Sequence, residues 1–451
     1  MSKKVFVIIE IFLLLAQTVI FAQTEPSFQS KLLVINHVTV IDTVGGAANR
    51  DMTVVITNGR ISKLGKNGTV KIPKNAQVIE ATGKFLIPGL WDMHTHLSFY
   101  ADTKEPPFTA FPALLSNGVT GARDLGSNLE QIDRWRKDIG DGTLVGPRIF
   151  RAGPYVDGPK KMNEFRAALT IVVNTPDEAR AAVKKLKERG ADFIKVHNAV
   201  PHDAYLALAD ECRKQKISLA THLPRSVRIE EASDAGTGSI EHIELILESV
   251  SFDVKAGEKP KDPLAALAEI TDEKANALFA RFVKNKTYYA PTLVGYRSFV
   301  QEAEEGAVKD PAKWRNSLAA RQKIFARFKE FVGMMQKSGV KILAGTDFAR
   351  KREAYPYPVP QPGTDLHDEL ALFVESGLTP LEALQTATLN PAKWLNIQKD
   401  YGTIEKGKVA DLVLLDANPL DDIKNTRKIS AVIIGGKIVS QANSTIQPGG
   451  K

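Results

Sequence analysis

The stretch FLIPGLWDMHTH at residues 85–96 decides both the fold and the chemistry expected of this chain. An apolar, strand-like run leads into two histidines that are separated by a single residue. Residues i and i+2 of a strand point to the same side, so His94 and His96 can hold one metal ion together. The pair alone is a weak signal, because two exposed histidines would look the same.

Downstream of this stretch, apolar runs alternate with amphipathic helices. The clearest helix covers residues 175–190, where Thr175 and Glu178 form a capping box and Pro176 takes the first helical position. About eight apolar runs follow one another, near residues 90, 120, 149, 194, 219, 241, 290 and 343. Repeated βα units predict a parallel sheet, and eight of them predict an α/β fold of the (β/α)8 TIM-barrel type.

The two ends of the chain differ from this middle part. Asn58-Gly59 separates two β-rich runs and predicts a hairpin, and Gly435-Gly436 separates two more near the other end. Both ends are therefore β-type. Within the middle part, residues 261–284 and 311–336 are rich in helix formers and predict helical insertions after the sixth and seventh runs.

Histidine, lysine and aspartate recur where the apolar runs end. Lys195 ends the fourth run, His222 the fifth, His242 the sixth and Asp347 the eighth. The carboxyl ends of barrel strands form one rim, which is where active sites lie. Together with the histidine pair of the first run, these side chains make six potential ligands on one rim. Any single one of them could still be a buried core residue.

The composition excludes several classes of protein. Of 451 residues, 43% are hydrophobic and 25% are charged, with eight histidines and one cysteine, Cys212. A disordered chain would have fewer apolar residues. One cysteine forms neither an internal disulfide nor a thiolate zinc fold. The net charge of +8 is scattered, without the basic run typical of nucleic-acid binding. Any metal must rest on histidine and carboxylate-type ligands.

Residues 1–22 have the order of a secretion signal. Lys3 and Lys4 precede an apolar stretch at residues 5–22, and a polar segment begins at Gln23. This order predicts a cleaved signal peptide and an exported protein, periplasmic or secreted, with no stable membrane insertion after cleavage. The alternative is a retained membrane anchor, for which the stretch is marginal in length.

Further motifs give the chain a family resemblance. They are PGLWDMHTH (residues 88–96), DFIK (192–195), His222, IEH (240–242), AGTD (344–347), HDEL (367–370), LTP (378–380), TLNP (388–391), GTI (402–404) and GKVADLV (407–413). With them the chain resembles the amidohydrolase superfamily, within it the metal-dependent hydrolases grouped with imidazolonepropionase and with dipeptidases that release C-terminal proline or arginine. The resemblance implies a barrel over residues 89–401 and a small β-sandwich built from residues 23–88 and 402–451.

The resemblance also implies a binuclear site for two divalent metal ions, to which zinc is suited and manganese, iron or cobalt are alternatives. Lys195 would bridge the ions after carboxylation by carbon dioxide, because a carbamate is an anion with two oxygens whereas an ammonium group repels cations. A salt bridge at this lysine, or a mononuclear site, is the alternative. The other ligands would be His94, His96 and Asp347 at the more buried ion and His222 and His242 at the second.

Such a site predicts a hydrolase. Two ions would turn a bridging water into hydroxide near neutral pH, and Asp347 would carry its proton to the leaving nitrogen. We expect hydrolysis of an amide bond in a small substrate, a dipeptide or an N-acyl amino acid. A cyclic amide, a lactone or a phosphoester is an alternative substrate. A non-catalytic binding protein would lack part of the ligand set, and a polyanion-binding protein would cluster its basic residues on one face.

Contacts to the substrate are less defined by the sequence. His197 lies two residues beyond Lys195, Arg225 follows His222 and could pair with a carboxylate, and Tyr155 follows the third run. A loop histidine, a solvated arginine and a packed tyrosine are the corresponding structural alternatives. Association of identical chains is compatible with the sequence. We expect His367 near the site, His37 and His202 in structural roles, and Glu241 facing away from the metals if its strand is regular.

Overall fold

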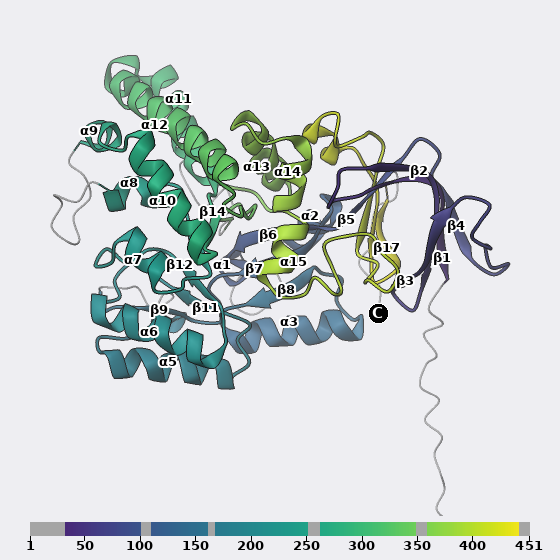
Figure 1. The fold of residues 1–451 in the computed structure, drawn as a ribbon, viewed down its shortest axis with the longest axis horizontal. Helices are drawn as coiled ribbons and strands as arrows, with labels where there is room; N and C mark the ends of the chain where they lie inside the picture. Colours follow the sequence, from purple (N-terminus) through teal and green to yellow (C-terminus); the bar gives the residue numbers. More distant parts are fainter. Residues whose placement is uncertain (1–31, 101–109, 161–166, 251–261, 349–358, 442–451) are drawn as a thin grey trace, which may run out of the picture. The chain divides into compact units, whose positions relative to one another are not determined.

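The two ends of the chain meet in one eight-stranded sheet (Figure 1). The computed structural model describes residues 32–100, 110–160, 167–250, 262–348 and 359–441. Seven strands lie in the order β17-β16-β15-β5-β1-β2-β3, and β4 pairs with β1. The strands are β1 (Leu33–Ile41), β2 (Ala48–Thr57), β3 (Arg60–Lys66), β4 (Gln77–Glu80), β5 (Phe85–Pro88), β15 (Leu412–Leu415), β16 (Ile429–Ile434) and β17 (Lys437–Gln441).

The joint between the two ends is the antiparallel pair of β5 and β15, in which Pro88 lies opposite Leu412. One face of the sheet buries its own apolar cluster, which includes Leu86 and Leu412. The predicted hairpin at Asn58-Gly59 is confirmed, since β2 and β3 pair across it. Both turn residues have positive φ, 52° and 74°, which is what a two-residue turn with the twist of a hairpin requires.

The middle of the chain forms parallel strands, as the alternation of runs and helices predicts. Six strands pair in the order β10-β9-β11-β12-β13-β14, and three in the order β6-β7-β8. Every residue of β6 and β7 is buried, as expected for parallel strands that are covered on both faces. The strands are β6 (Leu90–Thr95), β7 (Val119–Asp124), β8 (Arg148–Arg151), β9 (Tyr155–Asp157), β10 (Thr170–Val172), β11 (Ile194–Val196), β12 (Leu219–Thr221), β13 (Ser239–Glu241) and β14 (Tyr288–Ala290).

The eighth predicted run, residues 342–347, is not a regular strand. Isolated parallel bridges near its two ends join it to Tyr289 of β14 and to Thr95 of β6. Asp347 at its end has φ of 57°, so the backbone leaves the extended region there. The third run is divided as well, because β8 pairs with β7 whereas β9 pairs with β11. The strand pairings of the described residues therefore form two parallel sheets, linked by bridges, and not one closed barrel.

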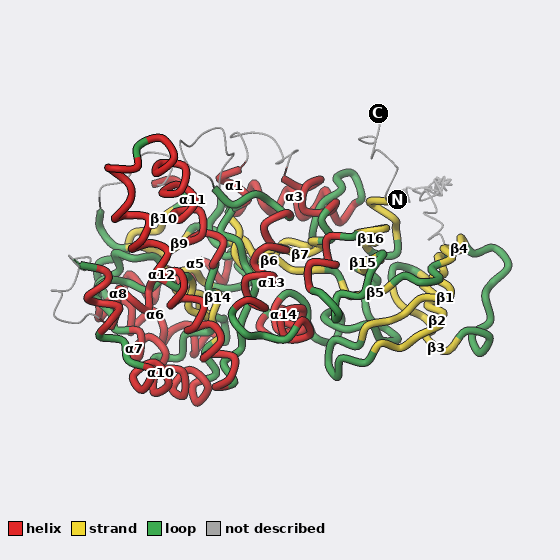
Figure 2. The backbone as a smooth tube through the Cα atoms, turned by 90° about the horizontal axis from the view of Figure 1, so that it is seen from above, coloured by secondary structure: helices red, strands yellow, loops and turns green. Residues whose placement is uncertain are grey.

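Helices follow the parallel strands and lie around them (Figure 2). The predicted capping box is confirmed, since Thr175 and Glu178 close the start of α5 onto each other. The helices are α1 (Leu97–Tyr100), α2 (Ala110–Ser116), α3 (Leu129–Asp141), α5 (Pro176–Glu188), α6 (His202–Gln215), α7 (Ile229–Asp234), α8 (Glu244–Val250), α9 (Pro263–Ala268), α10 (Asp272–Asn285), α11 (Leu293–Lys309), α12 (Pro311–Ser338), α13 (Thr364–Glu375), α14 (Pro380–Thr386), α15 (Leu389–Trp394) and the 3-10 helix η2 (Ile423–Arg427).

The helical insertions lie where the sequence predicts them, as α9 and α10 and as α12. Thr379, Pro380 and Glu382 repeat the pattern of Thr175, Pro176 and Glu178 and predict a helix through Leu389, and this prediction is wrong at its end. The segment divides into α14 and α15, because Thr388 leaves the helical conformation at φ −134° and ψ −77°. Within the described ranges, no helix has an apolar stretch of membrane-spanning length. The predicted signal at residues 1–22 lies outside the described residues.

Candidate metal centre

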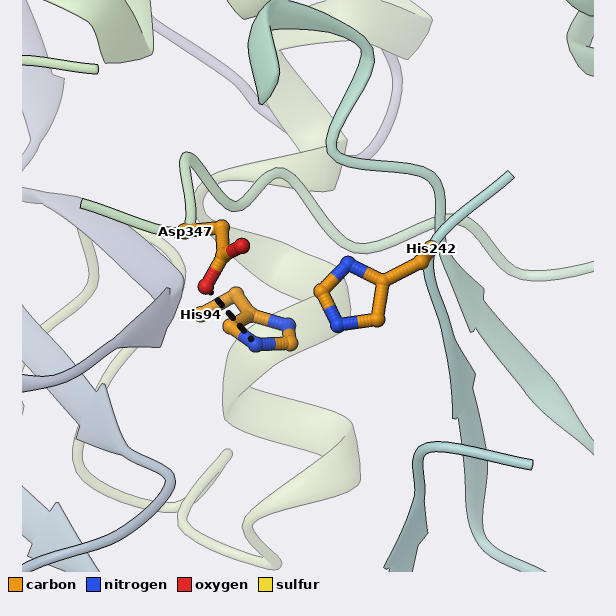
Figure 3. A group of neighbouring side chains, drawn as sticks. All are labelled: His94, His242 and Asp347. Atoms are coloured by element: carbon orange, nitrogen blue, oxygen red, sulfur yellow. Dashed lines mark ion pairs between the residues drawn. The ribbon is translucent and has the colours of Figure 1, made fainter. Parts of the chain in front are cut away.

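Three predicted ligands converge at the carboxyl ends of the parallel strands (Figure 3). His94 belongs to β6, His242 follows β13, and Asp347 ends the run at residues 342–347. One ligand atom from each of them lies within 4.8 Å of the others. Side chains from β6, from the end of β13 and from the run at residues 342–347 thus lie close enough together to hold metal ions.

The other two predicted histidines extend this group. Oδ1 of Asp347 lies 3.4 Å from Nε2 of His94 and 3.2 Å from Nε2 of His96. The ring of His242 lies 4.5 Å from that of His94 and 4.9 Å from that of His222, measured between centroids. The four histidines and the aspartate, here called the ligand cluster, are therefore contiguous, as their positions at strand ends predict.

Lys195 is buried beside the ligand cluster. Its side chain belongs to β11, it is 2% exposed, and Nζ has no hydrogen-bond partner among the described residues. Burial lowers the pKa of Lys195 to about 8. A buried ammonium group without a partner is costly, so this lysine favours a neutral amine or a modified form.

The electrostatics of the cluster favour metal-binding forms of its side chains. Burial lowers the pKa of His94, His222 and His242 well below 6.5, and the charge of Lys195 lowers it further. Neutral imidazoles keep a lone pair for a metal. Burial raises the pKa of Asp347, but the neighbouring His94 and the other histidine that it contacts outweigh burial, so its pKa is lowered overall.

Two of the predicted ligands have unusual backbone conformations. His242 and Asp347 have φ of 71° and 57°, in the left-handed region that costs a non-glycine residue about 1–3 kcal/mol. The surrounding contacts hold these turns in place. Asp92 accepts hydrogen bonds from the backbone amide (3.1 Å) and the hydroxyl (2.7 Å) of Thr346, and the hydroxyl of Tyr289 donates to the carbonyl of His242 (2.9 Å).

Glu241 faces the ligand cluster, which corrects the expectation that it faces away. Its Oε2 lies 2.9 Å from Nδ1 of His94, and Arg123 donates to its two carboxylate oxygens at 2.8 Å and 2.7 Å. The expectation assumed a regular strand through His242, but β13 ends at Glu241 and His242 turns into the left-handed region. Glu241 and His242 can therefore approach the same cluster.

Arg123 and Asp92 were missed by the sequence reasoning. Both are completely buried, Arg123 in β7 and Asp92 in β6. The available signal was a charged residue inside an otherwise apolar run, which is rare unless the charge is paired.

A second set of contacts supports His242 from its other side. Nδ1 of His242 lies 3.0 Å from the hydroxyl of Thr292, the residue before α11. The buried carboxylate of Glu369, in α13, accepts hydrogen bonds from the first two amides of α11, those of Leu293 (2.9 Å) and Val294 (2.8 Å). Glu369 thus fixes the start of the helix next to a ligand.

Of the three predicted substrate contacts, His197 adjoins the cluster and Tyr155 packs against His197. His197 stacks on His222 at 4.6 Å between ring centroids, and its Nδ1 lies 3.1 Å from the buried carboxylate of Asp157. The ring of Tyr155 lies 5.2 Å from His197, and its buried hydroxyl has no hydrogen-bond partner within the described part of the chain. The side chain of Arg225, in contrast, is exposed.

The remaining histidines make structural contacts. His367 was expected near the site, but its ring nitrogens contact the hydroxyl of Thr426 (2.9 Å) and the carbonyl of Asn117 (3.0 Å), so it ties α13 to η2 and to the loop before β7. His37 lies 2.8 Å from Asp51, and His202 contacts the carboxylates of Asp203 and Glu231 at 2.9 Å and 2.8 Å.

Known proteins that are similar to this chain are amidohydrolases and related hydrolases. The sequence model of the amidohydrolase family matches residues 85–439. An ochratoxinase of Aspergillus niger is 26% identical, over 87% of this chain and 84% of that protein. An imidazolonepropionase of Idiomarina loihiensis is 22% identical, over 84% of this chain and 89% of that protein. The crystal structure of a putative prolidase from Bifidobacterium longum matches with a TM-score of 0.71 and 26% identity, over 94% of this chain and 96% of that one.

Proposed function

Because the chain belongs to the amidohydrolase family, we propose that it hydrolyses the amide bond of a small substrate, a dipeptide or an N-acyl amino acid, with two divalent metal ions. The family and the hydrolase relatives make it a hydrolase that acts on carbon–nitrogen bonds. The observation that carries the finer proposal is the ligand cluster, together with the buried Lys195, whose Nζ has no hydrogen-bond partner among the described residues. Three of the four histidines of the cluster favour the neutral form, because burial lowers the pKa of His94, His222 and His242.

The residues present fit divalent metal ions. Nε2 of His94 and Nζ of Lys195 are buried and make no hydrogen bond to any described residue. Both atoms are therefore available to interact with a bound metal ion. Imidazole nitrogens with a carboxylate are donors that suit zinc, with manganese, iron or cobalt as alternatives. We assign His94, His96 and Asp347 to one ion and His222 and His242 to the other. When bound, the ions supply an activated water and polarise the substrate carbonyl.

Lys195 would serve both ions as a carbamate. Its neutral amine adds through Nζ to carbon dioxide and loses one proton, which leaves an anion with two oxygens in place of a cation. The support is that Nζ is buried beside the cluster without a hydrogen-bond partner among the described residues and that the pKa of the amine is lowered by burial.

Asp347 would move the proton during hydrolysis. Its carboxylate is ionised, because the histidines beside it lower its pKa, so it can take up a proton at Oδ1 or Oδ2. It then gives that proton to the nitrogen of the broken amide bond, which leaves as an amine. The contacts of Oδ1 with Nε2 of His94 (3.4 Å) and Nε2 of His96 (3.2 Å) orient this carboxylate.

The substrate would lie against the ligand cluster at the edge where His197 stacks on His222 and Tyr155 packs on His197. The hydroxyl of Tyr155, which has no hydrogen-bond partner among the residues that the structure describes, and the ring of His197 offer polar contacts at this edge. Arg225 is a weaker candidate, since its side chain is exposed, although it could pair with a substrate carboxylate. The prolidase relative supports a dipeptide. The second candidate substrate is a cyclic amide, which the imidazolonepropionase relative favours, or a lactone.

The finer architecture is also a proposal. We infer a (β/α)8 barrel over residues 89–401, closed by the run at residues 342–347, and a small β-sandwich made from residues 23–88 and 402–451. The bridges from that run to β14 and β6 support the closure, as does the solved prolidase relative. Residues 1–22 would be a signal peptide for export to the periplasm or beyond, which amino-terminal sequencing of the exported protein tests.

The function is tested by measuring metal content and activity together. Purified protein should hold two divalent ions per chain and should hydrolyse members of a library of dipeptides and N-acyl amino acids. The same preparation is assayed on cyclic amides and lactones, which separates the two candidates. Fully active protein with fewer than two ions per chain would contradict the binuclear site, and turnover of lactones or cyclic amides alone would favour the second candidate.

A further inference from the structure

Arg123 and Glu241 form a completely buried ion pair below the ligand cluster. Arg123 comes from β7 and Glu241 from β13, so the pair links the three-stranded sheet to the six-stranded one. The guanidinium group also donates to the hydroxyl of Ser239 (2.9 Å) and to the carbonyl of Met93 (2.5 Å). A buried ion pair is weak evidence of stabilisation, because removing two charges from water is costly. Its position next to a ligand suggests another role.

The contact between Glu241 and His94 fixes the position of one proton. A carboxylate paired with an arginine only accepts hydrogen bonds, so Nδ1 of His94, 2.9 Å from Oε2, must carry the hydrogen. Nε2 is then left with the lone pair. This atom makes no hydrogen bond to the described residues and faces Oδ1 of Asp347 at 3.4 Å.

We propose that Arg123 and Glu241 are positioning residues that hold His94 in the tautomer and orientation in which Nε2 binds the more buried metal ion. The inference rests on the proposed function, because it needs a metal at the cluster. In many proteins a carboxylate that accepts a hydrogen bond from a metal-binding histidine, without touching the metal, orients that histidine. Losing such a carboxylate weakens metal binding about 10–100-fold.

The packing around Arg123 keeps the carboxylate of Glu241 in one direction. The guanidinium group lies over the ring of Trp394, 4.4 Å from its centroid, and Phe193 lies 5.7 Å away. Ser239 donates a further hydrogen bond to Glu241 at 2.5 Å. With these contacts, neither partner of the pair can rotate without losing several hydrogen bonds.

His242 offers a contrast within the same cluster. Its Nδ1 contacts the hydroxyl of Thr292, which can either donate or accept a hydrogen bond and therefore selects no tautomer. Loss of the Arg123–Glu241 pair should therefore weaken the ion held by His94 and leave the ion held by His242 and His222 nearly unchanged.

Two double variants test the proposal. In Arg123→Met with Glu241→Met, both charges are replaced by apolar side chains, so that no buried charge is left without its partner and the fold is preserved. In Arg123→Met with Glu241→Gln, the charges are removed as well, but an amide oxygen remains to accept from His94. The matched control is Arg148→Met with Asp411→Asn, which removes an ion pair (3.0 Å) that touches no ligand.

Each metal-free protein is titrated with Co²⁺ or Zn²⁺ against a chromophoric chelator, its thermal unfolding is followed, and the ¹⁵N shifts of its histidines are recorded. We expect two tight sites in the wild type and the control. The Met/Met variant should bind one ion about 10–100-fold more weakly and lose the Nδ1–H signature of His94. The Met/Gln variant should stay within a few-fold of the wild type.

The outcomes separate the two proposals. If the Met/Met variant binds both ions as tightly as the wild type, or if the Met/Gln variant is weakened as much as the Met/Met variant, the positioning role is wrong. A lower unfolding temperature with unchanged affinities would show a purely structural pair and would also overturn it. Fewer than two sites in the wild type would instead contradict the binuclear function itself.

Discussion

Lys195 is the residue on which the proposed chemistry depends most directly. We expect Lys195→Ala to reduce activity by about 100-fold or more, because no group is left to bridge the ions. Loss of a residue that only supports a metal ligand already reduces metal affinity or activity by about 10–100-fold. Added formate or acetate should restore part of the activity by occupying the space of the carbamate. The control is Lys214→Ala, at a surface ion pair of α6. Wild-type activity without added carboxylate would rule out the bridging role.

Asp347 gives a second prediction at this scale. Asp347→Asn keeps an oxygen near the histidines but cannot accept a proton, so kcat should fall about 10²–10⁴-fold while the fold is retained. Steady-state kinetics and metal content should be measured on the same samples. Asp210→Asn, which removes a carboxylate at an ion pair between α5 and α6, is the control. Unchanged turnover in Asp347→Asn would show that another group carries the proton.

The proposed ligands could be grouped from the sequence because each lies at or just after the end of an apolar run. The contacts around them could not be predicted. Glu241 contacts His94 because the left-handed turn at His242 interrupts the alternation of side chains along the strand. The IEH motif does not predict that turn. Arg123 finds its partner 118 positions away, so only the pairing of the sheets reveals the contact.

The start of α11 links helix stability to the proposed metal site, because Glu369 caps it and Thr292 contacts His242 there. Glu369→Ala should lower the free energy of unfolding by about 2 kcal/mol or more, because two buried amides lose their acceptor at about 1–3 kcal/mol each. It should also weaken metal binding at His242, since Thr292 stands at the same helix start. Urea unfolding and metal titration measure the two effects.

The control for this element is Glu375→Ala in the same helix α13. Its carboxylate makes a surface ion pair with Lys329 at 3.2 Å, which contributes less than about 1 kcal/mol. If both variants lost the same stability, the capping role of Glu369 would be wrong.

Whole elements were predicted where local chemistry determines them. The capping boxes at Thr175 and Thr379 mark the starts of α5 and α14, since each box satisfies amides within the same turn. The eighth run was predicted as a strand, yet only isolated bridges hold it. The backbone of this run leaves the extended conformation at Asp347, where it turns beside the ligand cluster. The positive φ of Asp347 cannot be predicted from the pattern of apolar residues.

At the scale of the whole molecule, bound metal should link the strands to one another. The proposed ligands come from β6, β11, the ends of β12 and β13, and the run at residues 342–347. Removal of metal with a chelator should therefore lower the midpoint of thermal unfolding. Free metal at 100 times its Kd contributes about 2.7 kcal/mol for each site. An unchanged midpoint after complete removal, verified by metal analysis, would contradict a structural link.

The metal-free molecule should also lose stability in mild acid. Histidines of the unfolded chain take up protons below about pH 6.5, whereas His94 and His242 stay neutral in the fold because burial lowers their pKa well below that value. Stability therefore falls as the pH drops below 6.5, by up to about 1.4 kcal/mol per pH unit for each histidine. Urea unfolding at several pH values should show a flatter dependence in His94→Gln. Equal slopes would refute this origin of the acid sensitivity.

The pairing of β5 with β15 also sets the order in which this protein can be completed during synthesis. β5 leaves the ribosome long before its partner β15, because the whole set of parallel strands and their helices lies between them in the sequence. Until then the apolar edge of β5 has no neighbour on that side, and such an edge can pair with other chains. Closing the sheet is a contact between distant segments, which is slow. A nascent chain therefore exposes an edge that can aggregate until β15 has been translated, and a translational pause before β15 would prolong that period.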